Sequence, residues 1–236
     1  MRFNQKIFGV IFFAALFFSS QMAFAQQAPD LKSEIFPKLR DRKCDTMSLD
    51  KCNCPDAKEI KGYIEGLIEA GVKKEDVIYK AAKKFSPSII LDSQLKAEIE
   101  KKLATEIGEN RPQISLETET FDFGKVSKKQ GSVRKIIKLR NKGNQDLIVS
   151  EIKPSCSCTT VSLQVDKNKS SYFGQAGSGK GWQMVIGPNK EGELEIVFDA
   201  AHPTIKAGHV SRNIAITSND PLYGQVVVRF EVQVTD

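Results

Sequence analysis

Apolar and polar positions follow two different periods along this chain, and the change falls near Asn110. Over residues 56–107, apolar residues recur every three or four positions, which is the spacing of one face of an α-helix. From Pro112 onward, apolar and polar residues alternate, and Val, Ile and Thr become frequent, as is typical of β-strands. The pattern therefore predicts a helical first half and an all-β second half.

Apolar stripes with helical spacing predict three helices in the first half. The stripe residues are Ile60, Ile64, Leu67 and Ile68, then Val77, Ile78, Ala81 and Phe85, then Leu95, Ile99 and Leu103. Pro55 suits a first helical turn, and Gly71 suits the position just past a helix end. We expect a small three-helix bundle at residues 44–107, after a loosely ordered segment at 26–43 and before a linker at 108–112 that carries Gly and Pro.

The second half has short alternating segments separated by Gly, Asn and Pro turns. An apolar run that ends at Gly124 comes first, and the further expected strands are 133–141, 147–152, 159–165, 194–199, 213–217 and 226–234. The long stretch at 164–183 is predicted to be a loop insertion or an extra hairpin. This spacing suits two packed sheets, so we expect an antiparallel β-sandwich at residues 113–236.

Residues 1–25 have the pattern of an export signal. Arg2 and Lys6 form a basic start, residues 7–18 are almost wholly apolar, and Ala23-Phe24-Ala25 is a small-x-small cleavage site. The apolar run of about a dozen residues is shorter than the ~20 that span a bilayer. We expect a mature chain that is periplasmic or extracellular and does not span the membrane.

The charge distribution argues against nucleic acid as a partner. The formal net charge of +6 falls to +4 on signal removal, because Arg2 and Lys6 leave with no acidic residue. Lysines alternate with glutamates, as on solvated helix faces, rather than forming a basic stripe with aromatic residues. Gly174 to Lys180 has the spacing of a phosphate-binding loop, but Gly181 stands where a Ser or Thr must bind magnesium. Neither nucleic acid nor nucleotide is therefore an expected partner.

The first Cys-x-Cys pair, Cys52 and Cys54, precedes the first predicted helix. A thiolate at Cys54 would feel the positive end of the helix dipole, which lowers thiol pKa and favours reactivity. Cys52 is close enough to act as the resolving partner, and Cys44 could reach either. This makes Cys52 and Cys54 a candidate catalytic pair. The alternative is a bridge from Cys44 to Cys52 or Cys54 that staples the preceding segment.

The second pair, Cys156 and Cys158, follows Pro154 at a corner between two strands. Residues i and i+2 of a strand share one face, so these thiols can point the same way. Three alternatives are open: two reduced thiols, a local bridge, or half of a soft-metal site that takes copper or zinc. The sequence requires no cofactor, and the pair is a candidate metal site.

Besides its cysteines, the helical half has several short sequence motifs that resemble those of a known family. After the cysteines come Ile60-Lys61-Gly62-Tyr63-Ile64, then Glu69-Ala70-Gly71-Val72-Lys73-Lys74-Glu75-Asp76-Val77-Ile78, and Lys84-Phe85. This half resembles the helical domain of the CcmH-type cytochrome c maturation thiol oxidoreductases. The resemblance implies a three-helix bundle whose cysteine pair acts on the haem-binding thiols of apocytochrome c. That family has Cys-x-x-Cys, whereas one residue separates Cys52 from Cys54.

The β half carries a more specific pattern. Its elements are Phe121-Asp122-Phe123-Gly124-Lys125-Val126, Asn141-Lys142-Gly143, Ile152-Lys153-Pro154-Ser155-Cys156-Ser157-Cys158-Thr159, Phe198-Asp199 and Thr217-Ser218-Asn219-Asp220-Pro221. They resemble a bacterial exported domain family of unknown function, related to the hydin and ASH immunoglobulin-like domains. That family has Cys-Gly-Cys-Thr where this chain has Ser157 between the cysteines. The resemblance implies an immunoglobulin-like fold for the sandwich.

Two hypotheses for function follow. In the first, the chain is an exported accessory protein that handles thiols or metal. If it is an enzyme, it is a thiol–disulfide oxidoreductase that exchanges disulfides with another envelope protein through Cys52 and Cys54 during cytochrome c maturation. In the second, it is a non-catalytic structural or protein-binding module of the envelope, and its cysteines are structural staples.

Overall fold

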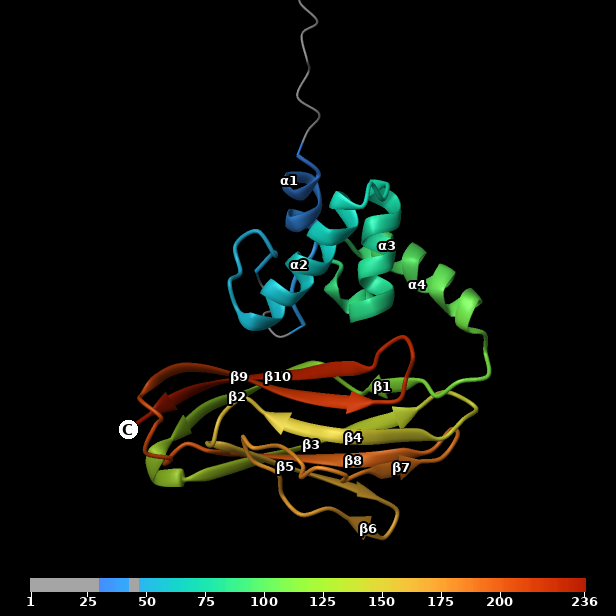
Figure 1. Cartoon of the computed structure of the whole chain (residues 1–236). Helices are drawn as coiled ribbons and strands as arrows, with labels where there is room; N and C mark the ends of the chain where they lie inside the picture. The colour runs from blue at the N-terminus through green and yellow to red at the C-terminus, as the bar shows by residue number, and fades with distance from the viewer. Residues whose placement is uncertain (1–29, 43–46) are drawn as a thin grey trace, which may run out of the picture.

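The computed structural model of the protein describes residues 30–42 and 47–236 (Figure 1). The predicted export signal and Cys44 lie outside these residues. Within them, helices gather in the first half and strands in the second, so the predicted order of a helical bundle followed by a β-sandwich is confirmed.

The three predicted helices are α2 (Pro55–Glu69), α3 (Lys74–Phe85) and α4 (Ser93–Ile107). Their starts have the expected chemistry: Pro55 occupies the first turn of α2, and the Asp92 side chain accepts a hydrogen bond from the Leu95 amide at 2.7 Å to cap α4. The apolar stripes meet in one core, in which Ile60, Ile64 and Val77 are fully buried. The helical half is therefore held together by the faces that the periodicity predicts.

The segment before these helices is not loosely ordered in its described part, contrary to our expectation for residues 26–43. It contains α1 (Leu31–Ile35) and the short 3-10 helix η1 (Phe36–Lys38). Ile35 and Leu39 are fully buried in the helical core, and Leu39 pairs with Ile90 just after a second 3-10 helix, η2 (Pro87–Ile89). Leu31 and Phe36 pack against the same core, so burial of several apolar side chains orders this segment.

The strands form two sheets packed face to face. One has the order β1 (Ile114–Leu116), β3 (Ser132–Asn141), β8 (Glu191–Asp199), β5 (Thr159–Val165) and β6 (Asn168–Lys169). The other has the order β2 (Thr120–Ser127), β10 (Gln225–Thr235), β9 (Gly208–Ser218), β4 (Leu147–Pro154) and β7 (Met184–Ile186), and a 3-10 helix, η3 (Lys128–Gln130), links β2 to β3. Alternate residues of both sheets point inward, as in other β-sandwiches.

Aromatic rings fill the middle of the sandwich. Phe198 and Phe230 are fully buried on opposite sheets, with ring centroids 5.5 Å apart, and Phe123 lies edge-on to Phe230 at 5.2 Å. Phe121 and Phe123 belong to β2, which joins the edge of its sheet parallel to β10 rather than antiparallel. The chain crosses from one sheet to the other between β1 and β2, which brings β2 beside β10. The register shifts near Gly124, which has a φ of +72°.

The long stretch at 164–183 contains an extra hairpin, one of the two predicted alternatives. β6 pairs with the end of β5, and Phe173 then pairs with Val161. Trp182 packs edge-on against Phe173 with a centroid distance of 4.8 Å. This hairpin and the chain after it therefore cover the edge of the sheet beyond β5.

The two halves meet at the turn between β9 and β10. Leu222 in this turn is buried in the helical core, and the Tyr223 hydroxyl donates a hydrogen bond to Glu100 of α4. Asp220 is buried and accepts hydrogen bonds from the Ile114 amide at 2.9 Å and the Leu222 amide at 2.8 Å. Figure 1 shows the helices over the sheet that contains β9 and β10.

Candidate functional site

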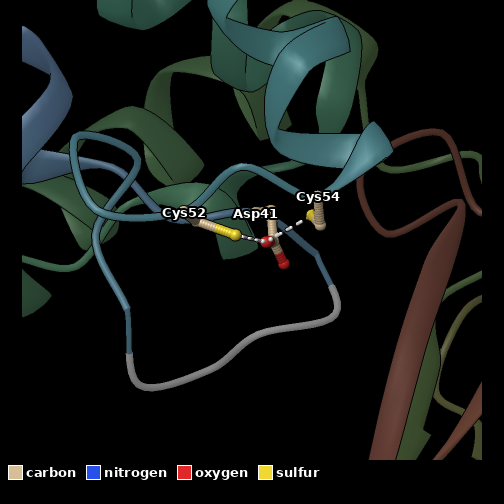
Figure 2. Close-up of side chains that lie close together, drawn as sticks. All are labelled: Asp41, Cys52 and Cys54. Atoms are coloured by element: carbon tan, nitrogen blue, oxygen red, sulfur yellow. Dashed lines mark hydrogen bonds between the residues drawn. The ribbon is translucent and has the colours of Figure 1, made fainter.

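Cys52 and Cys54 meet at one carboxylate. Both thiol sulfurs lie 3.0 Å from Oδ2 of Asp41 and donate to it, as Figure 2 shows. Asp41 and Cys52 are buried, and Cys54 is partly exposed. Among the described residues, neither Cys52 nor Cys54 is in a disulfide. The structure thus brings the two sequence-predicted cysteines together and adds an acidic third member.

Regular structure on both sides positions these three side chains. Arg40 pairs with Ser48 as an isolated β-bridge, which sets Asp41 beside the segment that carries the cysteines. Cys54 is the N-cap of α2, and its sulfur accepts a hydrogen bond from the Ala57 amide at 3.3 Å. The bridge holds Asp41 close to the cysteines, and the Ala57 amide orients the Cys54 side chain.

The electrostatics of Cys54 differ from our expectation. Burial is the main cause that raises its pKa to about 11, and its hydrogen bond to Asp41 adds to the effect. The Ala57 amide acts in the opposite direction, as expected at a helix N-terminus, but it is the weaker influence. The prediction of a lowered thiol pKa was therefore wrong, because it considered only the helix dipole and neither the burial of the thiol nor its hydrogen bond to Asp41.

Asp41 was missed by the sequence reasoning. It lies 11 residues before Cys52 and 13 before Cys54, at no spacing that indicates a shared site. Its place follows from the Arg40–Ser48 bridge and from the burial of Leu39, which are tertiary features. The one signal available was an acidic residue within a short segment that also holds the cysteines.

Cys156 and Cys158 form a disulfide with each other at the corner between β4 and β5. This is the local-bridge alternative, and the bridge packs at the sandwich core, apart from the helical core that contains Cys52. Nε of Arg212 lies 3.4 Å from the Cys158 sulfur. A metal site at this pair would require reduction of the bridge first, so that hypothesis stays a prediction.

A cleft runs between the helical half and the outer face of the sheet that contains β9 and β10. One hollow of about 50 Å³ is lined by Asp41, Arg42 and Lys96 on the helical side and by Tyr223, Gln225 and Val227 on the sandwich side, among others. A second hollow of about 290 Å³ shares Gln225 and Val227 and extends along β4 and β9. The two hollows thus adjoin at Gln225 and Val227.

The second hollow has an apolar floor and a polar rim. Ala215 and Val227 face outward on neighbouring strands, since the residues beside them in sequence, such as Ile214, Ile216 and Val228, point into the core. The rim residues are Glu151, Lys153, Ser155, Gln175, Asn213 and Gln225. Such a lining offers apolar contact area together with hydrogen-bond donors and acceptors.

Comparisons with known proteins concern the sandwich. A protein-family model described as HYDIN/CFA65/VesB-like, Ig-like domain matches residues 112–231. The match does not include the helical half, so the resemblance of that half to the cytochrome c maturation family has no support from it. A search of curated proteins found no match.

Several solved structures are similar to about half of this chain at low identity. A protein of unknown function from Porphyromonas gingivalis W83 is 15% identical over 53% of this chain and 49% of its own, with a TM-score of 0.39. PapD-like domain 7 of human CEP192, an ASH/PapD-like domain, is 12% identical over 55% of this chain and 88% of its own, with a TM-score of 0.32. The YadV chaperone is 15% identical over 52% of each chain, with a TM-score of 0.32. The chain spans about half the length of the first and third of these structures.

None of the helices at residues 30–42 and 47–236 combines the length and apolar character needed to cross a bilayer.

Proposed function

Because this chain belongs to the HYDIN/CFA65/VesB-like Ig-like domain family through residues 112–231, we propose that it is a non-catalytic protein-binding module of the cell envelope. In this proposal, residues 1–25 export the chain, the helical bundle occupies 44–107, and the sandwich occupies 113–236 after a linker at 108–112. The observation that carries the proposal is the cleft, whose smaller hollow is lined by both halves and adjoins the larger hollow on the sandwich.

The shape of the cleft favours a segment of a partner protein over a small molecule. Sites for small molecules usually bury most of the ligand surface. The larger hollow here has the exposed residues Lys153, Ser155 and Gln175 on its rim, so it leaves much of a ligand open to solvent. A surface of this kind suits an extended segment whose side chains contact the apolar floor while its backbone bonds to the rim.

The partner segment is expected to contact both halves at once. Gln225 and Val227 lie in both hollows, and the hollow that they share with Lys96 continues to the helical wall. Leu222 and Tyr223 hold the helical half against the sandwich at one end of this surface. Partner binding therefore depends on the two halves keeping their relative placement.

Photo-cross-linking in the native envelope tests this proposal. A photoreactive residue in place of Lys153, on the rim, should give an adduct of defined mass with a partner protein. The matched probe replaces Lys135, which is exposed on β3 of the other sheet, and should not give this adduct.

A second pair of variants tests whether the partner binds in the larger hollow of the cleft. Ala215→Arg fills the floor and should lower the Lys153 adduct at least about tenfold, equivalent to a loss of about 1.4 kcal/mol of binding free energy. Ser211→Arg places the same charge on the same face of β9, but Ser211 does not line the larger hollow. This variant should leave the adduct unchanged. An equal adduct from the Lys135 probe, or one that persists in Ala215→Arg, would overturn the proposal.

Thiol–disulfide exchange at Cys52 and Cys54 has weaker support as a function. Because the pKa of Cys54 is raised to about 11, its thiol is protonated at neutral pH and is a poor nucleophile. Mixed-disulfide trapping addresses this hypothesis: if exchange occurs, replacing both cysteines with serine abolishes the trapped species.

A further inference from the structure

We propose that Asp41, Cys52 and Cys54 form a zinc-binding site in the helical half, a role separate from partner binding in the cleft. The three side chains present two sulfur atoms and one carboxylate oxygen, all within 4.8 Å of one another. They come from two segments that the Arg40–Ser48 bridge holds together. A metal ion among them would cross-link these segments directly ahead of α2.

The spacing of the donor atoms fits a tetrahedral zinc ion with little movement. Zinc binds thiolate sulfur at ~2.3 Å and carboxylate oxygen at ~2.0 Å, so a tetrahedral ion needs sulfur–oxygen separations of ~3.5 Å. The two sulfur–oxygen distances here are each 3.0 Å. A tetrahedral ion also needs the two sulfurs ~3.8 Å apart, and they lie within 4.8 Å of each other. Each sulfur–oxygen separation therefore has to widen by about half an ångström, the sulfur–sulfur separation has to change by no more than about one ångström, and the fourth coordination position is left for water.

Proton and charge balance also favours a divalent ion. Both thiols donate to the same oxygen of Asp41, so the metal-free cluster holds two neutral thiols and one carboxylate. When Zn²⁺ binds, two S–H bonds break, two Zn–S bonds and one Zn–O bond form, and two protons leave to solvent. The cluster carries one negative charge before and after, so burial of Asp41 and Cys52 adds no net charge penalty.

The surroundings of the cluster suit thiolate ligands. The Ala57 amide points at the Cys54 sulfur, at 3.3 Å, and would stabilise its thiolate. Nζ of Lys61 donates to the Cys52 carbonyl at 2.6 Å, which places a positive charge next to the anionic site. Asp41 lines the smaller hollow of the cleft, which supplies an access path from solvent. Sulfur donors disfavour Mg²⁺ and Ca²⁺, which take oxygen ligands.

The test uses the exported full chain, kept free of oxygen, with Zn²⁺ and Co²⁺ as probes. Competition with a chromogenic chelator should give one Zn²⁺ per chain. Co²⁺ should give a thiolate-to-metal charge-transfer band, which reports sulfur coordination directly on the unmodified protein. Zn²⁺ should also protect Cys52 and Cys54 from alkylation.

Matched variants assign the ligands. Cys52→Ser and Cys54→Ser should each lower zinc affinity by more than about 100-fold, because loss of a residue that only hydrogen-bonds to a metal ligand already costs ~10–100-fold. Asp41→Asn should lower zinc affinity at least about tenfold. The other Cys-x-Cys pair is the control: replacing Cys156 and Cys158 together with serine should leave the affinity unchanged. Circular dichroism checks that each variant is folded.

Several outcomes would overturn the zinc site. These are no charge-transfer band with Co²⁺ on the unmodified protein, zinc binding that survives in Cys52→Ser or Cys54→Ser, and unchanged affinity in Asp41→Asn. Loss of binding in Cys44→Ser would also overturn it, since the proposed ligand set does not contain that residue. The result is independent of the cross-linking outcome, because none of these measurements involves a partner protein.

Discussion

Replacing Leu222 with alanine should destabilise the helical half although Leu222 belongs to the turn between β9 and β10. Its side chain is 6% exposed and packs in the helical core. The change removes three buried carbon groups at ~0.8 kcal/mol each, or about 2.4 kcal/mol of transfer free energy. Because the cavity opens at the junction and can partly collapse, we expect a total loss of about 2–3 kcal/mol, in the lower part of the usual range.

Two spectroscopic probes separate the halves in a urea titration. Far-ultraviolet circular dichroism follows the helices, and fluorescence of Trp182, the single tryptophan, follows the sandwich. In Leu222→Ala the unfolding transition of the helices should move to a lower urea concentration, by an amount equivalent to about 2–3 kcal/mol. This change should be at least about twice any change in the transition that Trp182 fluorescence reports.

The matched control is Leu91→Ala, the same chemical change in the helical half at a side chain that is 41% exposed. This control should change the free energy of unfolding by less than about 0.5 kcal/mol. An unchanged helical transition in Leu222→Ala, or a loss equal to that of the control, would refute the reasoning that this turn completes the helical core.

Two further predictions concern the same junction. Gly143→Ala should lower the free energy of unfolding by about 2–3 kcal/mol in a denaturant titration, because its new Cβ would collide with the Arg111 carbonyl oxygen. The control is Gly179→Ala, whose new Cβ would have no atom of the described residues within 4 Å and which should have little effect. Equal effects of the two substitutions would contradict the clash. Burial is the main cause that raises the pKa of Tyr223 above its ordinary 10.0, and the hydrogen bond to Glu100 adds to it. The folded state therefore keeps a proton that the unfolded state loses, so the free energy of unfolding should fall as the pH rises above about 10. Tyr223→Phe should make this alkaline decline shallower in urea titrations across that pH range, and an identical slope would count against it.

Much of the fold was predictable because it rests on local periodicity. The stripe from Ile60 to Ile68 predicts α2, and alternation from Val226 to Val234 predicts β10, since each pattern directly selects one face for burial. The helices α1 and η1 were not predicted, although Leu31, Ile35 and Leu39 recur every four residues, because so short an apolar stripe is ordered only by its burial against Ile90 and its neighbours. The parallel pairing of β2 was also missed, because local alternation carries no information on strand direction.

Local periodicity predicted α2, α3, α4 and the longer strands, and the sequence shows the four cysteines of the two Cys-x-Cys pairs directly. The tertiary structure was needed to show that Cys156 and Cys158 are bonded to each other, while Cys52 and Cys54 share the carboxylate of Asp41. It also decided the thiol pKa, since burial and a nearby charge outweigh the helix N-terminus at Cys54. The physical reason is that periodicity acts between neighbours in the chain, whereas desolvation and charge act between groups that only folding brings together.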